Sequence, residues 1–150
     1  RQALAHLAKS ERDTARQLLN QAVALKPAFF PARQRLIALA EEDKDWAAVV
    51  VQRRWFAENR PSDANTLALA EALSKTDQAG KKEAEALLLP LANKNNIGAM
   101  IALSRLYQQS GDAEGARQSL ERAQQAAPTN SDVAFEYGTL LEEQKNQDAA

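Results

Sequence analysis

The sequence predicts an all-α fold built from repeated pairs of antiparallel helices that stack as an α-solenoid. Three observations carry this prediction. Ala, Leu, Gln, Glu, Lys and Arg dominate the composition, and all of them are strong helix formers. The one β-branched cluster, Val49-Val50-Val51, lies inside a helical pattern and lacks the alternation of a strand. Finally, Pro27, Pro61 and Pro128 lie 34 and 67 residues apart, close to one and two periods of a repeat.

The same period recurs in the residues expected near the start of every second helix. These residues are small or of medium size, and their spacings are 34, 35, 32 and 34: Ala15, Val49, Ala84, Ala116 and Ala150. Turn signals precede each of them, at Ser10-Glu11, Lys44-Asp45, Gly80-Lys81, Gly111-Asp112 and Asn146-Gln147. A helix–turn–helix unit is therefore expected five times, giving about nine helices of about 11–15 residues each.

The best-defined unit covers residues 97–130. Small side chains let two helices approach, and larger ones fill the space between layers: Met100, Leu103, Ser104, Tyr107, Ala116, Leu120, Ala123 and Pro128. Gly111 can end the first helix and Asp112 can cap the second. In size and spacing this unit resembles the tetratricopeptide repeat (TPR) family. The resemblance extends over the whole chain and implies a right-handed superhelix of about four repeats.

The other units follow in order along one expected repeat domain. The first unit is a partial repeat over 1–29, and it matches the repeat pattern only in its later positions, at Ala15, Leu19, Ala22 and Pro27. The repeat over 30–63 is looser, and the repeat over 64–96 is the most degenerate. Its Pro90 predicts either a kinked helix or an early helix end, and its irregular length gives Sel1-like repeats as the alternative family. A partial repeat over 131–150 ends the sequence. We expect a fragment of a longer protein, with apolar faces at both ends.

The bulk composition excludes several function classes. The net charge of −1, from 19 basic and 20 acidic residues, argues against a nucleic-acid partner. No apolar run approaches the roughly 18 residues of a membrane span, so membrane insertion by this segment is not expected. With no cysteine and one histidine, His6, neither a metal site nor a cofactor is expected, and His6 is assigned a packing role. Catalysis is not expected, since the carboxylates and glycines form no recognisable reactive set. The compartment, cytoplasm or periplasm, stays open.

The resemblance implies a protein or peptide partner, bound in the concave groove that the first helix of each pair lines. The groove residues it indicates are Gln34, Asn65, Ala68, Ala72, Ile101, Arg105, Gln108, Phe135 and Thr139. Trp46 is expected in the core, whereas Trp55 is expected at the outer surface or a seam, where it could contact a partner. The predicted function is a non-catalytic scaffold. Its Ala- and Gln-rich composition is similar to that of bacterial repeat proteins, some of which serve envelope assemblies for polysaccharide export, pilus biogenesis or secretion. The alternative is a structural spacer or self-association module.

Overall fold

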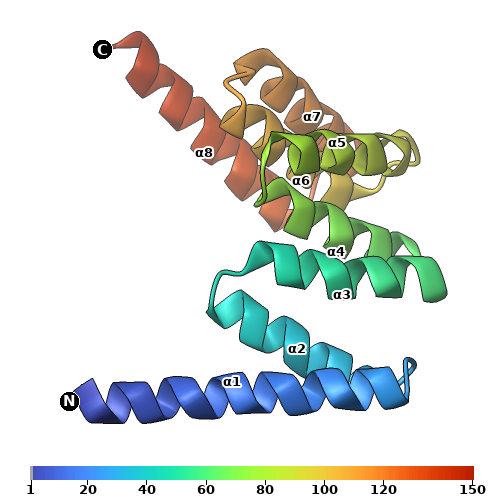
Figure 1. The fold of residues 1–150 in the computed structure, drawn as a ribbon. Helices are drawn as coiled ribbons and strands as arrows, with labels where there is room; N and C mark the ends of the chain where they lie inside the picture. Colours follow the sequence, from blue (N-terminus) through green and yellow to red (C-terminus); the bar gives the residue numbers. More distant parts are fainter. Residues whose placement is uncertain (1) are drawn as a thin grey trace. The chain divides into compact units, whose positions relative to one another are not determined.

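The structure, a computed structural model, describes residues 2–150, and these fold into eight α-helices without a strand (Figure 1). The all-α class is confirmed. In chain order the helices are α1 (Gln2–Leu25), α2 (Phe30–Glu42), α3 (Trp46–Asn59), α4 (Asp63–Ser74), α5 (Gln78–Asn93), α6 (Ile97–Gln109), α7 (Ala113–Ala126) and α8 (Ser131–Asp148). The chain divides into two compact units at Arg60–Pro61, so α1–α3 and α4–α8 are described separately.

Short polar residues fix where the helices start. Six of them accept a hydrogen bond from a backbone N–H in the first turn: Asp45, Ser62, Asp77, Asn96, Asp112 and Asn130. The preceding turns use left-handed backbone in three places, at Lys44, Asn95 and Gly111, where φ is 55°, 61° and 80°. Capping and turn geometry together set where these helices begin and end.

We expect the loss of one cap to be measurable at Asp112, whose Oδ1 accepts from the Gly115 N–H at 2.9 Å. Asp112→Ala leaves that N–H without its side-chain acceptor and should lower the free energy of unfolding by about 0.5–2 kcal/mol. Asp112→Asn keeps an acceptor oxygen and should lose much less. Urea unfolding followed by circular dichroism tests this, and an equal loss in both variants would argue against the cap.

The core of residues 61–150 follows the size pattern of the repeat. Ala84 and Ala116 are fully buried, as are Leu88 and Leu120. Ala116, Leu120 and Leu140 form one cluster that bridges α7 and α8, and Ile101, Tyr107 and Tyr137 pack against it. Each helix pair therefore buries its apolar face against the next pair, which is how a repeat fold forms one continuous core.

In residues 2–60 a buried arginine organises the contact between α2 and α3. Arg33 is 6% exposed. Its Nε donates to the Pro27 carbonyl at 2.7 Å and its Nη1 donates to Gln52 Oε1 at 2.8 Å. The guanidinium also stacks 3.9 Å from the Trp55 ring centre. Burial lowers the pKa of Arg33.

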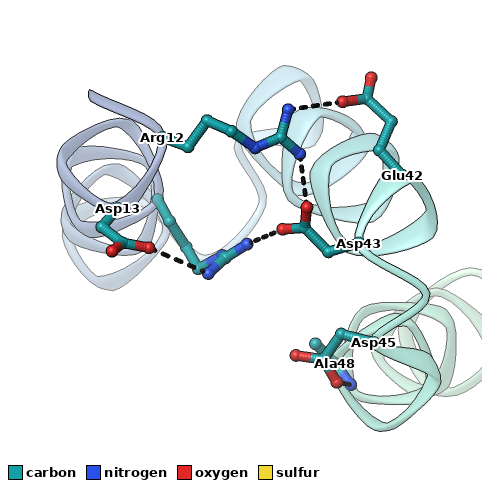
Figure 2. A network of polar contacts seen from close by, with 7 residues as sticks. Arg12, Asp13, Glu42, Asp43, Asp45 and Ala48 are labelled. Carbon is teal, nitrogen blue, oxygen red and sulfur yellow. Dashed lines mark hydrogen bonds and ion pairs between the residues drawn. The ribbon is translucent and has the colours of Figure 1, made fainter. Parts of the chain in front are cut away.

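Helix α1 is tied to the end of α2 by charged side chains (Figure 2). Arg12 donates to Glu42 at 2.9 Å and to Asp43 at 2.8 Å, and Arg16 pairs with both Asp43 and Asp13. All of these groups are about one-third exposed or more, so the network fixes the position of α1 more than it adds stability.

Two expected turns do not form, and a third is displaced: Gly80-Lys81 lies inside α5, and the turn before that helix falls at residues 75–77. α1 continues through Ser10-Glu11, and α8 continues through Asn146-Gln147, so the described residues hold eight helices instead of about nine. Neither dipeptide contains Gly or Pro, and all four residues are tolerated in a helix. The Thr14 hydroxyl donates to the Ser10 carbonyl at 2.9 Å within the helix. The packing role of His6 is also wrong: His6 is exposed, because no described helix covers the first turns of α1.

Pro90 does not end its helix. α5 runs on to Asn93, so the early-end alternative is wrong. Proline removes one backbone hydrogen bond, to the carbonyl four residues earlier. Pro90 is exposed, whereas Leu88 and Leu91 on either side of it are buried. Core packing of these leucines therefore holds the helix through a residue that disfavours it.

Candidate functional site

The first helices of three successive pairs, α4, α6 and α8, line one hollow within residues 61–150. Helix α6 contacts both α4 and α8, so the three lie in sequence across this face. The hollow has a volume of about 360 Å³, and we call it the central groove. Its lining residues are Glu71, Gly98, Ile101, Arg105, Asp132, Phe135 and Glu136.

The apolar part of the central groove comes from Ile101 and Phe135. On α8, Val133 and Leu140 are buried against the preceding pair. Phe135 is two residues from Val133, about 200° around the helix, so it points away from that contact. It is 72% exposed, whereas Ile101 is half-buried. An exposed phenylalanine beside a hollow gives a partner a large apolar contact.

The charged part of the groove is predominantly acidic. Arg105 pairs with Glu136 across α6 and α8. The hydrogen bond to Glu136 raises the pKa of Arg105, opposed by burial, and the charges of Glu136, Glu71 and Asp132 raise it further. The carboxylates of Glu71 and Asp132 also line the hollow. Three carboxylates and one guanidinium therefore leave an excess of two negative charges in the groove.

The structure brings three of the residues predicted for the groove together: Ile101, Arg105 and Phe135. The others lie elsewhere. Asn65, Ala68 and Thr139 are half-buried, and Ala72 is buried at 5% exposure. Gln108 lines a smaller hollow beside Gly111 and Leu140, and its amide contacts Ser104 at 3.3 Å. Gln34 is exposed on α2, in the other unit.

The two tryptophans are both half-buried. Trp55 lies in an aromatic cluster with Phe30 and Phe56, with ring centres 5.9 Å and 5.4 Å away, beneath the Arg33 guanidinium. These contacts show that the Trp55 ring packs against neighbouring side chains over most of its surface. A role of Trp55 in contacting a partner stays a prediction, and so does the core role of Trp46.

Glu71 and Glu136 were missed by the sequence reasoning. A helical residue four positions after another lies on the same face. Glu136 stands four residues after Asp132, so helical spacing alone could have found it once Asp132 was assigned to the groove. Glu71 occupies a repeat position where a small packing residue is expected. Because the repeat over 64–96 is irregular, the size pattern did not assign Glu71 to the groove.

In residues 2–150, no three side chains of His, Asp or Glu gather closely enough to hold a metal ion. Along the same residues, no helix combines the length and the apolar character that crossing a membrane requires.

Comparison with known proteins identifies the unit that carries α6 and α7. The family model described as "Tetratricopeptide repeat" matches residues 97–130. Residues 97–130 form a tetratricopeptide repeat. The resemblance drawn from the size pattern is thereby confirmed for residues 97–130, whereas its extension over the other units and the Sel1-like alternative for the repeat over 64–96 stay predictions.

Two further comparisons add little beyond the repeat itself. A thermophilic TPR protein of Thermus thermophilus is similar over 92% of this chain and 94% of its own, with 17% identity and a TM-score of 0.43. A likeness at this level does not bear on function. No curated protein matches the sequence. TPR units generally mediate contacts between proteins and are generally not catalytic, and this chain carries such a unit at the centre of its groove.

Proposed function

We propose that the chain is a non-catalytic scaffold that binds a segment of another protein in the central groove. The observation that supports this most directly is Phe135, which is 72% exposed beside Ile101 in a hollow of about 360 Å³. A large exposed apolar side chain rimmed by polar ones is typical of a docking surface. The setting we propose is a bacterial envelope assembly, by analogy with Ala- and Gln-rich repeat proteins of that kind.

The charge of the groove indicates the chemistry of the partner. Glu136 pairs with Arg105, and the carboxylates of Glu71 and Asp132 also line the hollow, so its lining residues carry an excess of two negative charges. A segment that carries Lys or Arg next to an apolar side chain would neutralise them while covering Phe135. An acidic segment would meet repulsion from both carboxylates. The proposed partner is therefore a basic and apolar protein segment.

Peptides of defined composition test this proposal. A fluorescently labelled peptide that alternates Lys with Leu should bind the chain, and one of equal length that alternates Glu with Leu should not. Phe135→Ala and Asp132→Lys should each weaken the binding by about tenfold or more, equivalent to about 1.4 kcal/mol. Added salt should weaken it further, because the groove charges are exposed.

Glu114→Lys is the matched control for the charge change, since Glu114 is an exposed carboxylate on α7 outside the groove. It should bind the basic peptide as the parent chain does. Equal binding of both peptides, or an equal loss in the control variant, would argue against the central groove. With binding established, the same variants used as bait for an envelope extract would identify the natural partner.

A further inference from the structure

Arg105 is the cation among the described residues that line the central groove, and carboxylates lie on both sides of it. It belongs to α6, which contacts α4 on one side and α8 on the other. Glu71 comes from α4, and Asp132 and Glu136 come from α8, one helical turn apart. One guanidinium therefore shares the groove with three carboxylates from two neighbouring helices.

The contacts of Arg105 are with the groove itself. Its Nη2 donates a hydrogen bond to Oε1 of Glu136. The side chain of Glu136 is 17% exposed, whereas that of Arg105 is 57% exposed. This hydrogen bond is the largest cause of the raised pKa of Arg105, burial opposes it, and the charges of Glu136, Glu71 and Asp132 add to it. Arg105 is therefore a counterion within the groove, held by a carboxylate that is less exposed than itself.

A counterion within the groove lowers the charge that a partner has to bring. Without Arg105, the lining residues would present three negative charges to a bound segment. With the Arg105–Glu136 pair in place, the excess is two. Two cationic side chains of a partner would balance that excess. A third would find no further negative charge to balance and would meet repulsion from the Arg105 guanidinium.

The positions of Glu71 and Asp132 determine where those two cations belong. Glu71 is on α4 and Asp132 is on α8, and α6, which carries Ile101, lies between these helices. Ile101 and Phe135 supply the apolar part of the lining. A segment that covers Ile101 and Phe135 with an apolar side chain thus reaches the two carboxylates in opposite directions. The order that fits is cation, apolar residue, cation.

We propose that the central groove selects a protein segment with two cationic side chains, one on either side of an apolar one, and that Arg105 sets this number. Arg105 acts as a specificity-determining residue in two ways. It balances the charge of Glu136, and it repels a third cation. This inference rests on the proposed function and extends it to the charge that the partner carries.

Three labelled peptides of equal length test the proposal on the whole chain. Each has a central leucine in a neutral background and carries one, two or three lysines, and fluorescence anisotropy gives the Kd of each. For the parent chain, the second lysine should strengthen binding by about three- to fivefold. The third lysine should strengthen it by less than about twofold, because the excess charge of the groove is already balanced.

Substitutions in the ion pair should move this preference in opposite directions. Arg105→Gln leaves three negative charges in the groove, so the third lysine should also strengthen binding by about three- to fivefold. Glu136→Gln leaves one, so the second lysine should add less than about twofold. The double variant Arg105→Gln/Glu136→Gln again leaves two and should restore the preference of the parent chain. Matched circular dichroism verifies that each variant is folded.

Arg117→Gln is the matched control for the loss of a cation. Arg117 pairs with Glu121 at 2.9 Å on α7, and neither residue lines the central groove. This variant removes the same charge from an exposed ion pair elsewhere and should keep the two-lysine preference. Arg105→Lys retains a cation in the groove and should keep it as well.

The possible failures separate this inference from the proposed function. A parent chain that binds none of the peptides, or binds them as well after Phe135→Ala, would contradict both. Binding that depends on Phe135 but keeps its two-lysine preference in Arg105→Gln would overturn the inference alone. An equal loss for all three peptides in Arg105→Gln would instead assign Arg105 a direct contact with the partner. A double variant that does not restore the preference would overturn the role of the charge.

Discussion

Leu88→Ala is expected to lower the free energy of unfolding by about 2–5 kcal/mol, a large effect for the truncation of a single side chain. Leu88 is fully buried on α5, a helix that packs against both α4 and α6. Removing its side chain loses the transfer free energy of the buried atoms and leaves a cavity that the surrounding helices only partly fill. The effect should appear as a lower urea midpoint in unfolding followed by circular dichroism.

The neighbouring residue supplies a close control. Leu89 follows Leu88 on the same helix, one residue before Pro90, and is 40% exposed. Leu89→Ala makes the same chemical change and should cost less than about 1 kcal/mol, because little buried area is lost. Similar losses in the two variants would mean that α5 packs through a different face.

Arg33→Met is expected to destabilise residues 2–60 by about 2–4 kcal/mol, although methionine preserves much of the side-chain volume. The change leaves the Pro27 carbonyl and the Gln52 side chain without their donor, and it removes the cation from the Trp55 ring. Arg33→Lys should not restore stability, since a single ammonium group cannot reproduce the planar fork that reaches both acceptors.

Tryptophan fluorescence is the appropriate measurement, because both tryptophans of the chain, Trp46 and Trp55, lie in residues 2–60. The emission should shift and the urea midpoint should fall for Arg33→Met. Arg35→Met is the matched control, since Arg35 is an exposed arginine on the same helix. It should change stability by about 0.5 kcal/mol or less. A Lys variant as stable as the parent would contradict the proposed role of the guanidinium fork.

The repeat period and the size classes at 97–130 were sufficient to predict the all-α fold, and residues 97–130 match the tetratricopeptide repeat. The prediction was possible because helix packing restricts side-chain size at fixed positions. The spacing of small and large residues in the sequence therefore indicates how the helices pack. The resemblance to the repeat family indicated Ile101, Arg105 and Phe135 as groove residues. Ile101 and Arg105 lie four residues apart on one face of α6, whereas Phe135 lies on α8 and joins them through the packing of the two helices.

The tertiary structure decided the rest. Ser10-Glu11 and Asn146-Gln147 resemble turn signals, yet these residues are helix-compatible, and no neighbouring helix in the described part of the chain forces a reversal there. Pro90 stays within α5 because Leu88 and Leu91 are held in the core. Glu71 and Glu136 join the groove only because α4, α6 and α8 lie next to one another. The sequence by itself determined the repeat and its helices, through local spacing. Which turns form, which charges meet and which faces stay uncovered depended on contacts between helices far apart in the chain.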